Sequence, residues 1–301
     1  MKAAVIINPH AGSGREPVGA RVDLARRALA DAGAEGEVIV TERGGHARDA
    51  AAALARRGVD LVVAWGGDGT INEVGSGLVF TQAALGIIPY GSGNGLAREL
   101  RLSMRPAAAL GAALTGRPRP FDVGELAGRY FLNIAGIGFD AVVASRFNAR
   151  PKGRRGAWPY VTLTFGALVG YEPDRYRVTL ECPTGIEDQY HREDYERPFF
   201  SVVLANSPQF GNRIRIAPEA RPDDGLLNAL LIDHRTIPGH LWRARYLLSD
   251  VRRAPGIVRR PVRAATIEGT APLRCQIDGE SFTAGVRAEA RVHPGALTLR
   301  M

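Results

Sequence analysis

The stretch Val63-Ala-Trp-Gly-Gly-Asp-Gly-Thr-Ile-Asn-Glu73 changes character at its centre, from an apolar run to a glycine-rich turn and then a polar, periodic segment. The apolar run Leu61–Ala64 predicts a buried strand, and Thr70–Val79 predicts a helix. Glycine in the turn allows the main chain to approach a ligand closely. Because amides at a helix N-terminus bind anions, the stretch predicts a phosphate-binding turn between a strand and a helix.

The same alternation of short apolar runs and longer periodic segments extends over the first 120 residues. Strands separated by helices of about 10–15 residues indicate a parallel sheet with both faces covered. We therefore predict an α/β domain over residues 1–120. The remaining expected strands are Ala3–Ile7, Val38–Val40 and Leu85–Ile88, and the remaining expected helices are Val18–Ala32, with Val22, Ala25 and Leu29 on one face, and His46–Arg57.

Two further glycine-rich turns follow expected strands of this domain. They are Asn8-Pro-His-Ala-Gly-Ser-Gly14 and Gly91-Ser-Gly-Asn-Gly95. In open parallel sheets ligands bind beyond the carboxyl ends of the strands, so the three turns are expected to converge on one edge. This arrangement favours a phosphate-binding site over turn chemistry alone.

Asp68 lies between glycines in the turn after the third expected strand. An acid beside bound phosphates is understandable when Mg²⁺ lies between the two negative charges. The same side chain is also a suitable N-cap for the helix that begins near Thr70. Both roles stay open, and the metal role is preferred.

The pattern changes at Gly116-Arg-Pro-Arg-Pro120, which marks the expected domain boundary. Alternating, strand-like runs dominate afterwards and predict a mainly antiparallel β domain over residues 121–301, with the last strand or helix able to pack back on the first domain. The expected strands are Arg175–Leu180, Phe199–Ala205, Leu226–Ile232, Val262–Ile267, Leu273–Ile277 and Arg287–Val292, and the clearest helix is His240–Val251.

Several classes of protein are excluded by what the sequence lacks. No run approaches the roughly 18 apolar residues of a membrane span. The chain has no P-loop, no protein-kinase signature and no G-x-S-x-G elbow, and its histidines lack zinc-ligand spacing. The two cysteines, Cys182 and Cys275, are expected to be buried thiols in a reducing cytoplasm. The net charge of +8 is spread along the chain without a nucleic-acid-binding motif, so no nucleic-acid partner is expected.

Six segments in the same order along the chain carry a resemblance to one enzyme family. They are Ile7-Asn-Pro-His-Ala-Gly-Ser-Gly14, Val63–Glu73, Gly86-Ile-Ile-Pro-Tyr-Gly-Ser-Gly-Asn-Gly-Leu-Ala-Arg98, Asn133-Ile-Ala-Gly-Ile-Gly-Phe-Asp-Ala141, Ala217-Pro-Glu-Ala-Arg-Pro-Asp-Asp-Gly-Leu226 and Ile277-Asp-Gly-Glu280. Together they resemble the diacylglycerol kinase catalytic-domain family, which includes bacterial lipid kinases and sphingosine and ceramide kinases. The resemblance implies an ATP- and Mg²⁺-dependent lipid kinase with its active site in the cleft between the two domains.

The resemblance also implies roles for individual residues. Asp278 and Glu280 match the position of the catalytic base, with the choice between them open, and Asp68 is expected beside the Mg²⁺ and the phosphates. Arg221, Asp224 and Leu226 match a structural Mg²⁺ site, with Arg221 and Leu226 offering carbonyl oxygens. The implied nucleotide contacts are Asn8, Thr41, Gly66, Gly67, Asp68, Gly69, Thr70, Ile71, Asn72, Gly91, Ser92, Gly93 and Asn94.

The identity of the lipid stays open. Many bacterial diacylglycerol kinases have an acid where this chain has Gly95, and Gly-Ser-Gly-Asn is closer to the sphingosine and ceramide kinases, so a diacylglycerol, a sphingoid or a related lipid all fit. Basic and aromatic residues around Arg150–Arg155 suit either a membrane surface or a solvated loop. A cytoplasmic enzyme in peripheral contact with a membrane is expected, and the resemblance suggests a homodimer.

Three other functions remain as alternatives. An NAD kinase-like enzyme shares the GGDGT core but accounts less well for the first loop and the later motifs. A nucleic-acid-binding protein rests on charge alone. A nucleotide sensor without catalysis would keep the loops and lose the transfer step.

Overall fold

The structure is a computed structural model that describes residues 1–12, 16–149, 164, 166–186, 189–211, 214–247 and 250–301. Main-chain contacts divide the chain into two compact units. Unit 1 comprises Met1–Phe121 and Gly295–Met301, and unit 2 comprises Asp122–Pro294. The segment Arg150–Arg155, expected at a membrane surface or in a loop, lies outside the described residues. In the part of the chain that is described, no helix has the length and apolar character needed to cross a bilayer.

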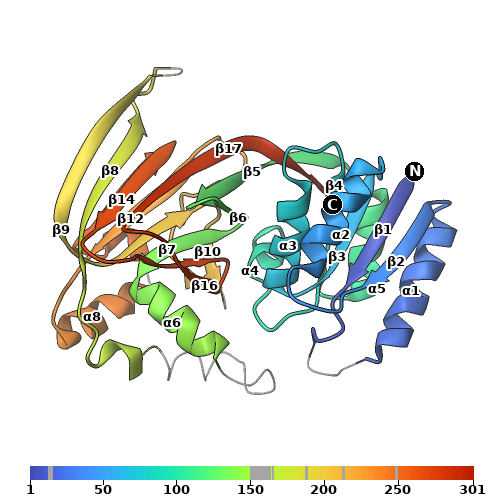
Figure 1. The fold of residues 1–301 in the computed structure, drawn as a ribbon, viewed down its shortest axis with the longest axis horizontal. Helices are drawn as coiled ribbons and strands as arrows, with labels where there is room; N and C mark the ends of the chain where they lie inside the picture. The colour runs from blue at the N-terminus through green and yellow to red at the C-terminus, as the bar shows by residue number, and fades with distance from the viewer. Residues whose placement is uncertain (13–15, 150–163, 165, 187–188, 212–213, 248–249) are drawn as a thin grey trace. The chain divides into compact units, whose positions relative to one another are not determined.

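Unit 1 is built on a parallel sheet in the order β17–β4–β3–β1–β2, which confirms the expected α/β class (Figure 1). Its strands are β1 (Lys2–Ile7), β2 (Glu35–Val40), β3 (Leu61–Gly66), β4 (Ala84–Pro89) and the end of β17 (Arg287–Arg300). Its helices are α1 (Val18–Asp31), α2 (His46–Arg56), α3 (Asp68–Leu78), α4 (Gly95–Glu99) and α5 (Pro106–Thr115).

Helices cover both faces of this sheet. Alternate β1 residues such as Val5 and Ile7 pack with Leu29 of α1 and Leu110 of α5. Every residue of β3 and β4 is buried, as expected for central parallel strands. On α1 the predicted residue Val22 packs against the core that contains Ala25 and Leu29, and Arg21 is also buried there.

Unit 2 is β-rich, with antiparallel pairing throughout its described strand pairs, as the sequence predicts. One path runs β16–β15–β7–β9–β8–β14–β17, while β12 joins β9 to β13, and β5 pairs with β6 and β17. The bounds are β5 (Pro118–Leu126), β6 (Arg129–Phe131), β7 (Ile134–Gly138), β8 (Arg175–Pro183), β9 (Tyr190–Ala205), β10 (Gln209–Gly211), β11 (Ile214–Arg215), β12 (Leu227–Asp233), β13 (Ile257–Val262), β14 (Ala264–Gly269), β15 (Arg274–Ile277) and β16 (Glu280–Thr283), with helices α6 (Phe139–Asn148) and α8 (Ile237–Ala244) and 3-10 turns η2 (Arg245–Leu247) and η3 (Val251–Arg253).

Strand β9 connects the two parts of the β structure. Its residues from Tyr190 to Pro198 pair with β8, and those from Phe199 to Ala205 pair with β7 and β12. The apolar sides of both parts share one core that includes Val178, Phe199 and Leu231.

Three of the differences from the expected boundaries have a structural reason. The expected strand Val262–Ile267 is two strands that separate at Arg263, because β13 pairs with β12 and β14 pairs with β8. Strand β9 begins at Tyr190 and not at the expected Phe199. Its first half is polar and partly exposed, so it has no apolar pattern that would predict a strand. The helix expected at His240–Val251 begins at Ile237 and ends at Ala244, with a proline in its first turn, where a missing amide costs little.

Candidate active site

The three glycine-rich loops of unit 1 touch one another at the carboxyl ends of β1, β3 and β4. The Asn8 side-chain amide donates to Thr70 Oγ1 at 2.8 Å, which joins the first loop to the second. A Cβ built on Gly91 would lie 2.6 Å from the Gly67 Cα, so the second and third loops pack main chain against main chain. Residues 13–15 of the first loop lie outside the described residues. The convergence expected from the sequence is therefore present.

Asp68 ties the second loop to the third. Its carboxylate accepts the main-chain amides of Asn94 at 2.9 Å and Gly95 at 2.8 Å. Asn94 has φ of 51°, and its side chain closes the loop by bonding both the amide and the carbonyl of Gly91. The expected alternative role for Asp68, capping its own helix, is wrong: Gly67 is the N-cap of α3 and no side chain caps it. Asp68 instead caps the start of α4.

Four main-chain amides in these loops have no acceptor among the residues that the structure describes. They belong to Gly69, Thr70, Ser92 and Gly93. The first two lie in the first turn of α3, where helix geometry leaves amides without intrahelical partners. Such amides are the usual donors to phosphate oxygens. The loops therefore fit a polyphosphate, although the amides of Gly91, Asn94 and Gly95 are already used within the protein.

Some predicted nucleotide contacts have structural duties. The Ile71 side chain is 1% exposed and its amide donates to Gly67, so Ile71 faces the core. Thr41 is buried at the end of β2, where its amide donates to the Ile7 carbonyl. Asn72 lies one turn further along α3 and accepts from the Ser76 hydroxyl. Ser92 is the exposed residue of the third loop, and its flanking glycines Gly91 and Gly93 are partly exposed.

Arg21 is a residue of this site that the sequence reading overlooked. Its side chain is 1% exposed, and its guanidinium donates to the Asn8 and Pro9 carbonyls at 3.0 Å each. It also lies 5.1 Å from the Tyr90 ring centroid. Its spacing of four residues from Ala25 was a signal that this arginine faces inward. Arg21 therefore fixes the conformation of the first loop by binding its main-chain carbonyls from the buried side.

In unit 2, Asp278 and Glu280 lie on the tight turn between β15 and β16. The Asp278 carboxylate accepts the main-chain amides of Leu132, Asn133 and Ile134 at 2.8–2.9 Å. Asp278 and Gly279 have φ of 45° and 88°, the two successive positive values that this hairpin turn needs. Glu280 is exposed at the start of β16. Asp278 therefore holds the turn, whereas the Glu280 side chain is exposed to solvent.

A buried hydrogen-bond network holds the turn between β15 and β16 on its inner side. The Gly279 amide donates to Gln276 Oε1 at 3.0 Å, and Gln276 Nε2 donates to Asp140 at 3.1 Å. The Ser201 hydroxyl donates to the same carboxyl at 2.5 Å. Burial raises the pKa of Asp140 above its ordinary value. Gln276 and Asp140 thus position the Glu280 turn, although only the tertiary fold brings them together.

The predicted metal residues Arg221, Asp224 and Leu226 lie on one loop of unit 2. Asp224 accepts the Leu226 amide at 3.1 Å, and Arg221 donates to Asp223. The buried Asp122 accepts the neighbouring Gly225 amide at 2.6 Å. Loss of solvent and the nearby Asp122 charge raise the pKa of Asp224. Two carboxylates that repel each other suit a hard cation such as Mg²⁺, and Asp122 is an addition to the predicted set.

Comparisons with known proteins decide the family. Residues 2–126 match the diacylglycerol kinase catalytic domain, and residues 133–301 match the YegS C-terminal NAD kinase beta sandwich-like domain. A Chromohalobacter salexigens protein named "Probable lipid kinase YegS-like" is 34% identical over 278 residues, which cover 89% of this chain and 85% of that protein. The chain belongs to the diacylglycerol kinase catalytic-domain family. The sequence-based resemblance is confirmed, and the protein is a lipid kinase, a phosphotransferase.

Two further bacterial proteins are similar to this chain. A Bacillus subtilis protein named diacylglycerol kinase is 31% identical over 236 residues, which cover 77% of this chain and 73% of that protein. The crystal structure of a diacylglycerol kinase from Bacillus anthracis superposes with a TM-score of 0.71 at 20% identity, covering 99% of this chain and 96% of that one. At that identity the superposition supports the fold alone.

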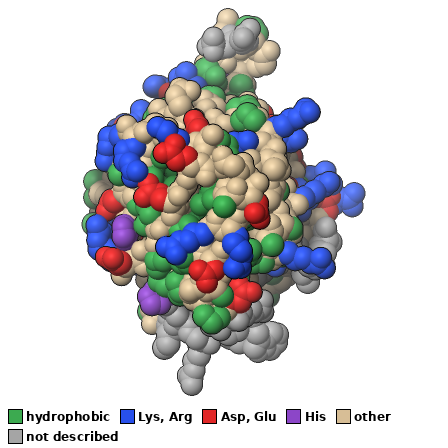
Figure 2. All heavy atoms as spheres, turned by 90° about the vertical axis from the view of Figure 1, so that its right-hand side faces the viewer, with side chains coloured by type: hydrophobic (Ala, Val, Ile, Leu, Met, Phe, Trp, Pro, Cys, Tyr) green, Lys and Arg blue, Asp and Glu red, His purple; other side chains and the backbone are tan. Residues whose placement is uncertain are grey.

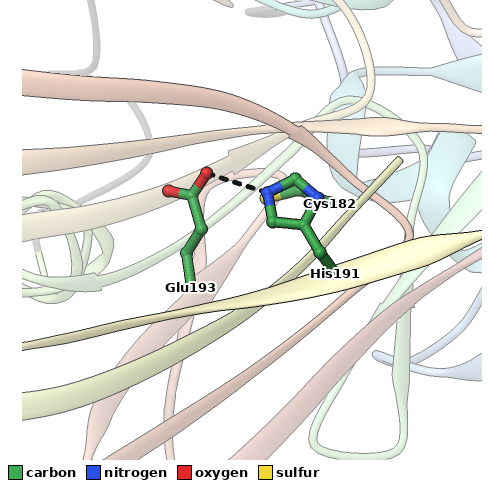
Figure 3. Close-up of side chains that lie close together, drawn as sticks. All are labelled: Cys182, His191 and Glu193. Carbon is green, nitrogen blue, oxygen red and sulfur yellow. Dashed lines mark hydrogen bonds and ion pairs between the residues drawn. The ribbon is translucent and has the colours of Figure 1, made fainter. Parts of the chain in front are cut away.

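A second cluster of polar side chains in the lipid kinase lies on the β8–β9 hairpin (Figure 3). Cys182 and His191 are cross-strand partners, and Glu193 lies two residues further on the same face, with the possible ligand atoms within 4.8 Å of one another. The spacing of these residues in the sequence does not predict the group, because the pairing register of β8 with β9 brings them together. Both Glu193 oxygens accept from Arg260 at 2.9 Å, and Tyr195 also donates to Glu193. The hydrogen bonds from Tyr195 and Arg260 lower the pKa of Glu193 to about 2, and the Arg260 guanidinium already neutralises the carboxylate that a metal ion would need.

Proposed function

We propose that this lipid kinase transfers the γ-phosphoryl group of ATP to a hydroxyl of a membrane lipid in the presence of Mg²⁺. The observation that carries the proposal is the set of free amides at Gly69, Thr70, Ser92 and Gly93, on loops that contact one another. Phosphoryl transfer depends mainly on positioning and charge neutralisation, and these loops supply fixed donors for the phosphate oxygens.

Glu280 is the residue we assign as the general base. It is exposed, whereas the Asp278 carboxylate accepts three main-chain amides of the 132–134 segment. The carboxylate of Glu280 accepts the proton of the lipid hydroxyl as the oxygen attacks phosphorus. Gln276 keeps the turn in place through the Gly279 amide, so the base has a defined position.

Mg²⁺ fits two groups of residues, one in each unit. Asp68 lies between the second and third loops, where its carboxylate accepts the Asn94 and Gly95 amides, and carboxylate oxygens are the ligands that Mg²⁺ prefers. Asp122 and Asp224, with the Arg221 and Leu226 carbonyls, form the second candidate set. The ion supplies neutralisation of phosphate charge at Asp68 and cancels carboxylate repulsion in the 221–226 loop.

The acceptor is proposed to be a lipid, and the site of action the cytoplasmic surface of a membrane. Relatives of this chain are named as lipid and diacylglycerol kinases, and that supports the choice of acceptor class. Figure 2 shows basic and acidic side chains interspersed over the face it presents, which does not favour a nucleic-acid partner there. A homodimer stays a proposal.

Labelled ATP with lipid extracts, with purified diacylglycerol and sphingoid lipids, and with NAD tests the function. We expect Mg²⁺-dependent label in the organic phase. Label on NAD would show the nucleotide-kinase alternative instead, and nucleotide binding without any transfer would show a sensor. Asp224→Asn should raise the Mg²⁺ concentration needed for half-maximal transfer severalfold while Asp223→Asn, its exposed neighbour, leaves it unchanged.

A further inference from the structure

Helix α8 of unit 2 is inverted relative to an ordinary surface helix. A surface helix normally buries an apolar stripe and exposes its polar face. In α8 the polar residues His240 and Arg243 are 8% and 6% exposed. The apolar residues Ile237, Leu241 and Trp242 are 42%, 43% and 43% exposed. The spacing of 237, 241 and 242 puts them on one side of the helix, so they form one outward apolar face.

The buried polar side fixes this orientation. The Arg243 guanidinium donates to the Asp233 carbonyl at 2.8 Å and the Gly256 carbonyl at 3.1 Å. The His240 ring lies 3.9 Å from the Phe200 ring, and the Arg235 amide reaches its Nε2 at 3.1 Å. Rolling the helix to bury its apolar face would leave a guanidinium without acceptors, which is costly. The buried contacts of Arg243 and His240 therefore keep the apolar face of α8 exposed to solvent.

Aromatic and basic side chains border this face. The Arg245 guanidinium lies 4.4 Å from the Trp242 ring and 4.9 Å from the Tyr246 ring. On η3, which contacts η2, Arg252 and Arg253 expose 61% and 82% of their side chains. Asp250 pairs with both of them and Glu219 also lies near Arg252, so three arginines stand beside two acids. Tryptophan, tyrosine and arginine next to exposed aliphatic residues are the composition of helices that lie in a membrane interface.

We propose that the surface formed by Ile237, Leu241, Trp242, Arg245, Arg252 and Arg253, here the α8 surface, docks the enzyme on an anionic bilayer. The helix lies parallel to the membrane with its apolar face among the headgroups and upper acyl chains, and the arginines bind lipid phosphates. At eight residues α8 is too short to cross a bilayer. The proposal rests on the proposed function, because a kinase that phosphorylates membrane lipids has to bind a membrane.

Charge argues for a bilayer over a second copy of the chain. In a symmetric dimer the same surface meets itself, so the α8 surface would bring Arg252 and Arg253 close to their own copies. Like charges at an interface oppose association. An anionic leaflet offers opposite charge to the same arginines together with an apolar layer for Leu241 and Trp242.

Vesicle sedimentation of the full chain tests the docking. Wild type is expected to bind phosphatidylcholine–phosphatidylglycerol vesicles and to bind pure phosphatidylcholine far more weakly. The Leu241→Ser/Trp242→Ser variant should lose on the order of tenfold or more in partition coefficient, because two large apolar side chains no longer enter the bilayer. Arg252→Glu/Arg253→Glu should remove the preference for anionic lipid. Ile186→Ser is the matched control, since Ile186 is 60% exposed at the β8–β9 connection, and its binding should equal wild type.

Tryptophan fluorescence identifies the face that enters the membrane even if a variant folds poorly. Trp65 is fully buried, so in a Trp158→Phe background Trp242 is the exposed reporter. Its emission should shift to the blue on anionic vesicles and be quenched by brominated acyl chains. Vesicle binding without this change, or binding by the Leu241→Ser/Trp242→Ser variant equal to wild type, overturns the proposal. A dimer in light scattering that the variant dissociates also overturns it, by assigning the face to a second copy.

These measurements need no ATP, so they separate docking from catalysis. A chain that binds vesicles through Trp242 but transfers phosphate to no lipid would refute the proposed function and leave the docking surface standing. If both hold, the Leu241→Ser/Trp242→Ser variant should phosphorylate detergent-dispersed lipid at the wild-type rate and lipid in vesicles at least tenfold more slowly.

Discussion

The carboxylate of Asp68 accepts the main-chain amide of Asn94 at 2.9 Å, across 26 residues of sequence. A second bond from Gly95 makes the same carboxylate the N-terminal cap of α4. One acidic side chain therefore sets the distance between the second and third glycine-rich loops. Asp68 thereby holds the free amides of the second loop at a fixed position relative to those of the third loop.

Asp68→Asn should weaken both the fold and nucleotide binding. The carboxamide keeps one acceptor oxygen but turns an NH₂ group toward an amide donor, so one buried bond is lost. We expect a decrease of about 1–3 kcal/mol in the free energy of unfolding, and a lower affinity for ATP. Urea unfolding and ATP titration measure the two effects. Asp49→Asn, on the exposed face of α2, is the control, and it should change neither the free energy of unfolding nor the ATP affinity much. Wild-type ATP affinity in Asp68→Asn would contradict the assigned role.

Glu280→Gln and Asp278→Asn should separate catalysis from stability. Glu280 is exposed, so Glu280→Gln should leave urea unfolding unchanged and lower lipid phosphorylation by roughly 10²–10⁴-fold. Asparagine tolerates the positive φ of residue 278, so Asp278→Asn tests the carboxylate itself. We expect this variant to unfold at lower urea, because one of the bonds to the 132–134 amides is lost. Turnover by Glu280→Gln near that of wild type would remove it as the base.

Gly91→Ala should disrupt the contact between the second and third loops. A Cβ at residue 91 would lie 2.6 Å from the Gly67 Cα and 2.9 Å from the Asn94 side chain. We expect about 1–3 kcal/mol of destabilisation and weaker ATP binding. Gly111→Ala is the matched control, because a Cβ there has nothing within 4 Å and the position is inside α5. That substitution should be neutral or stabilising. Equal effects of the two variants would show that Gly91 is not needed for close packing.

The unfolding free energy should fall as the pH drops from about 6.5 to about 4. Burial and the nearby Arg243 lower the pKa of His240 to about 4, below its unfolded value. In that interval the unfolded chain binds the proton and the folded chain does not, so acid favours unfolding. His240 makes no such contribution at higher pH. The difference between wild type and His240→Gln in urea unfolding across this interval measures it, and parallel pH profiles would contradict the low pKa.

The sequence by itself determined the class of each half and the family. Leu61–Ala64 followed by Gly66-Gly-Asp-Gly-Thr70 predicts a strand, an anion-binding turn and a helix because local rules of apolar period and glycine conformation act within a few residues. The turns after β1, β3 and β4 were predictable in the same way, since parallel strands end at one edge. An Asp-Gly pair such as Asp278-Gly279 is likewise a local signal for a hairpin turn.

Only the tertiary structure decided which of these residues bind and which support. Asp68 meets Asn94, and Asp278 meets the 132–134 segment, across long separations that no periodicity encodes. The outward apolar face of α8 is equally a matter of tertiary structure, because Leu241 and Trp242 are exposed although a surface helix usually buries its apolar residues. The acceptors for Arg243 come from the ends of two other strands, and hydrogen bonds to those carbonyls override the hydrophobic period. A sequence shows which groups need partners; the fold determines where the partners are.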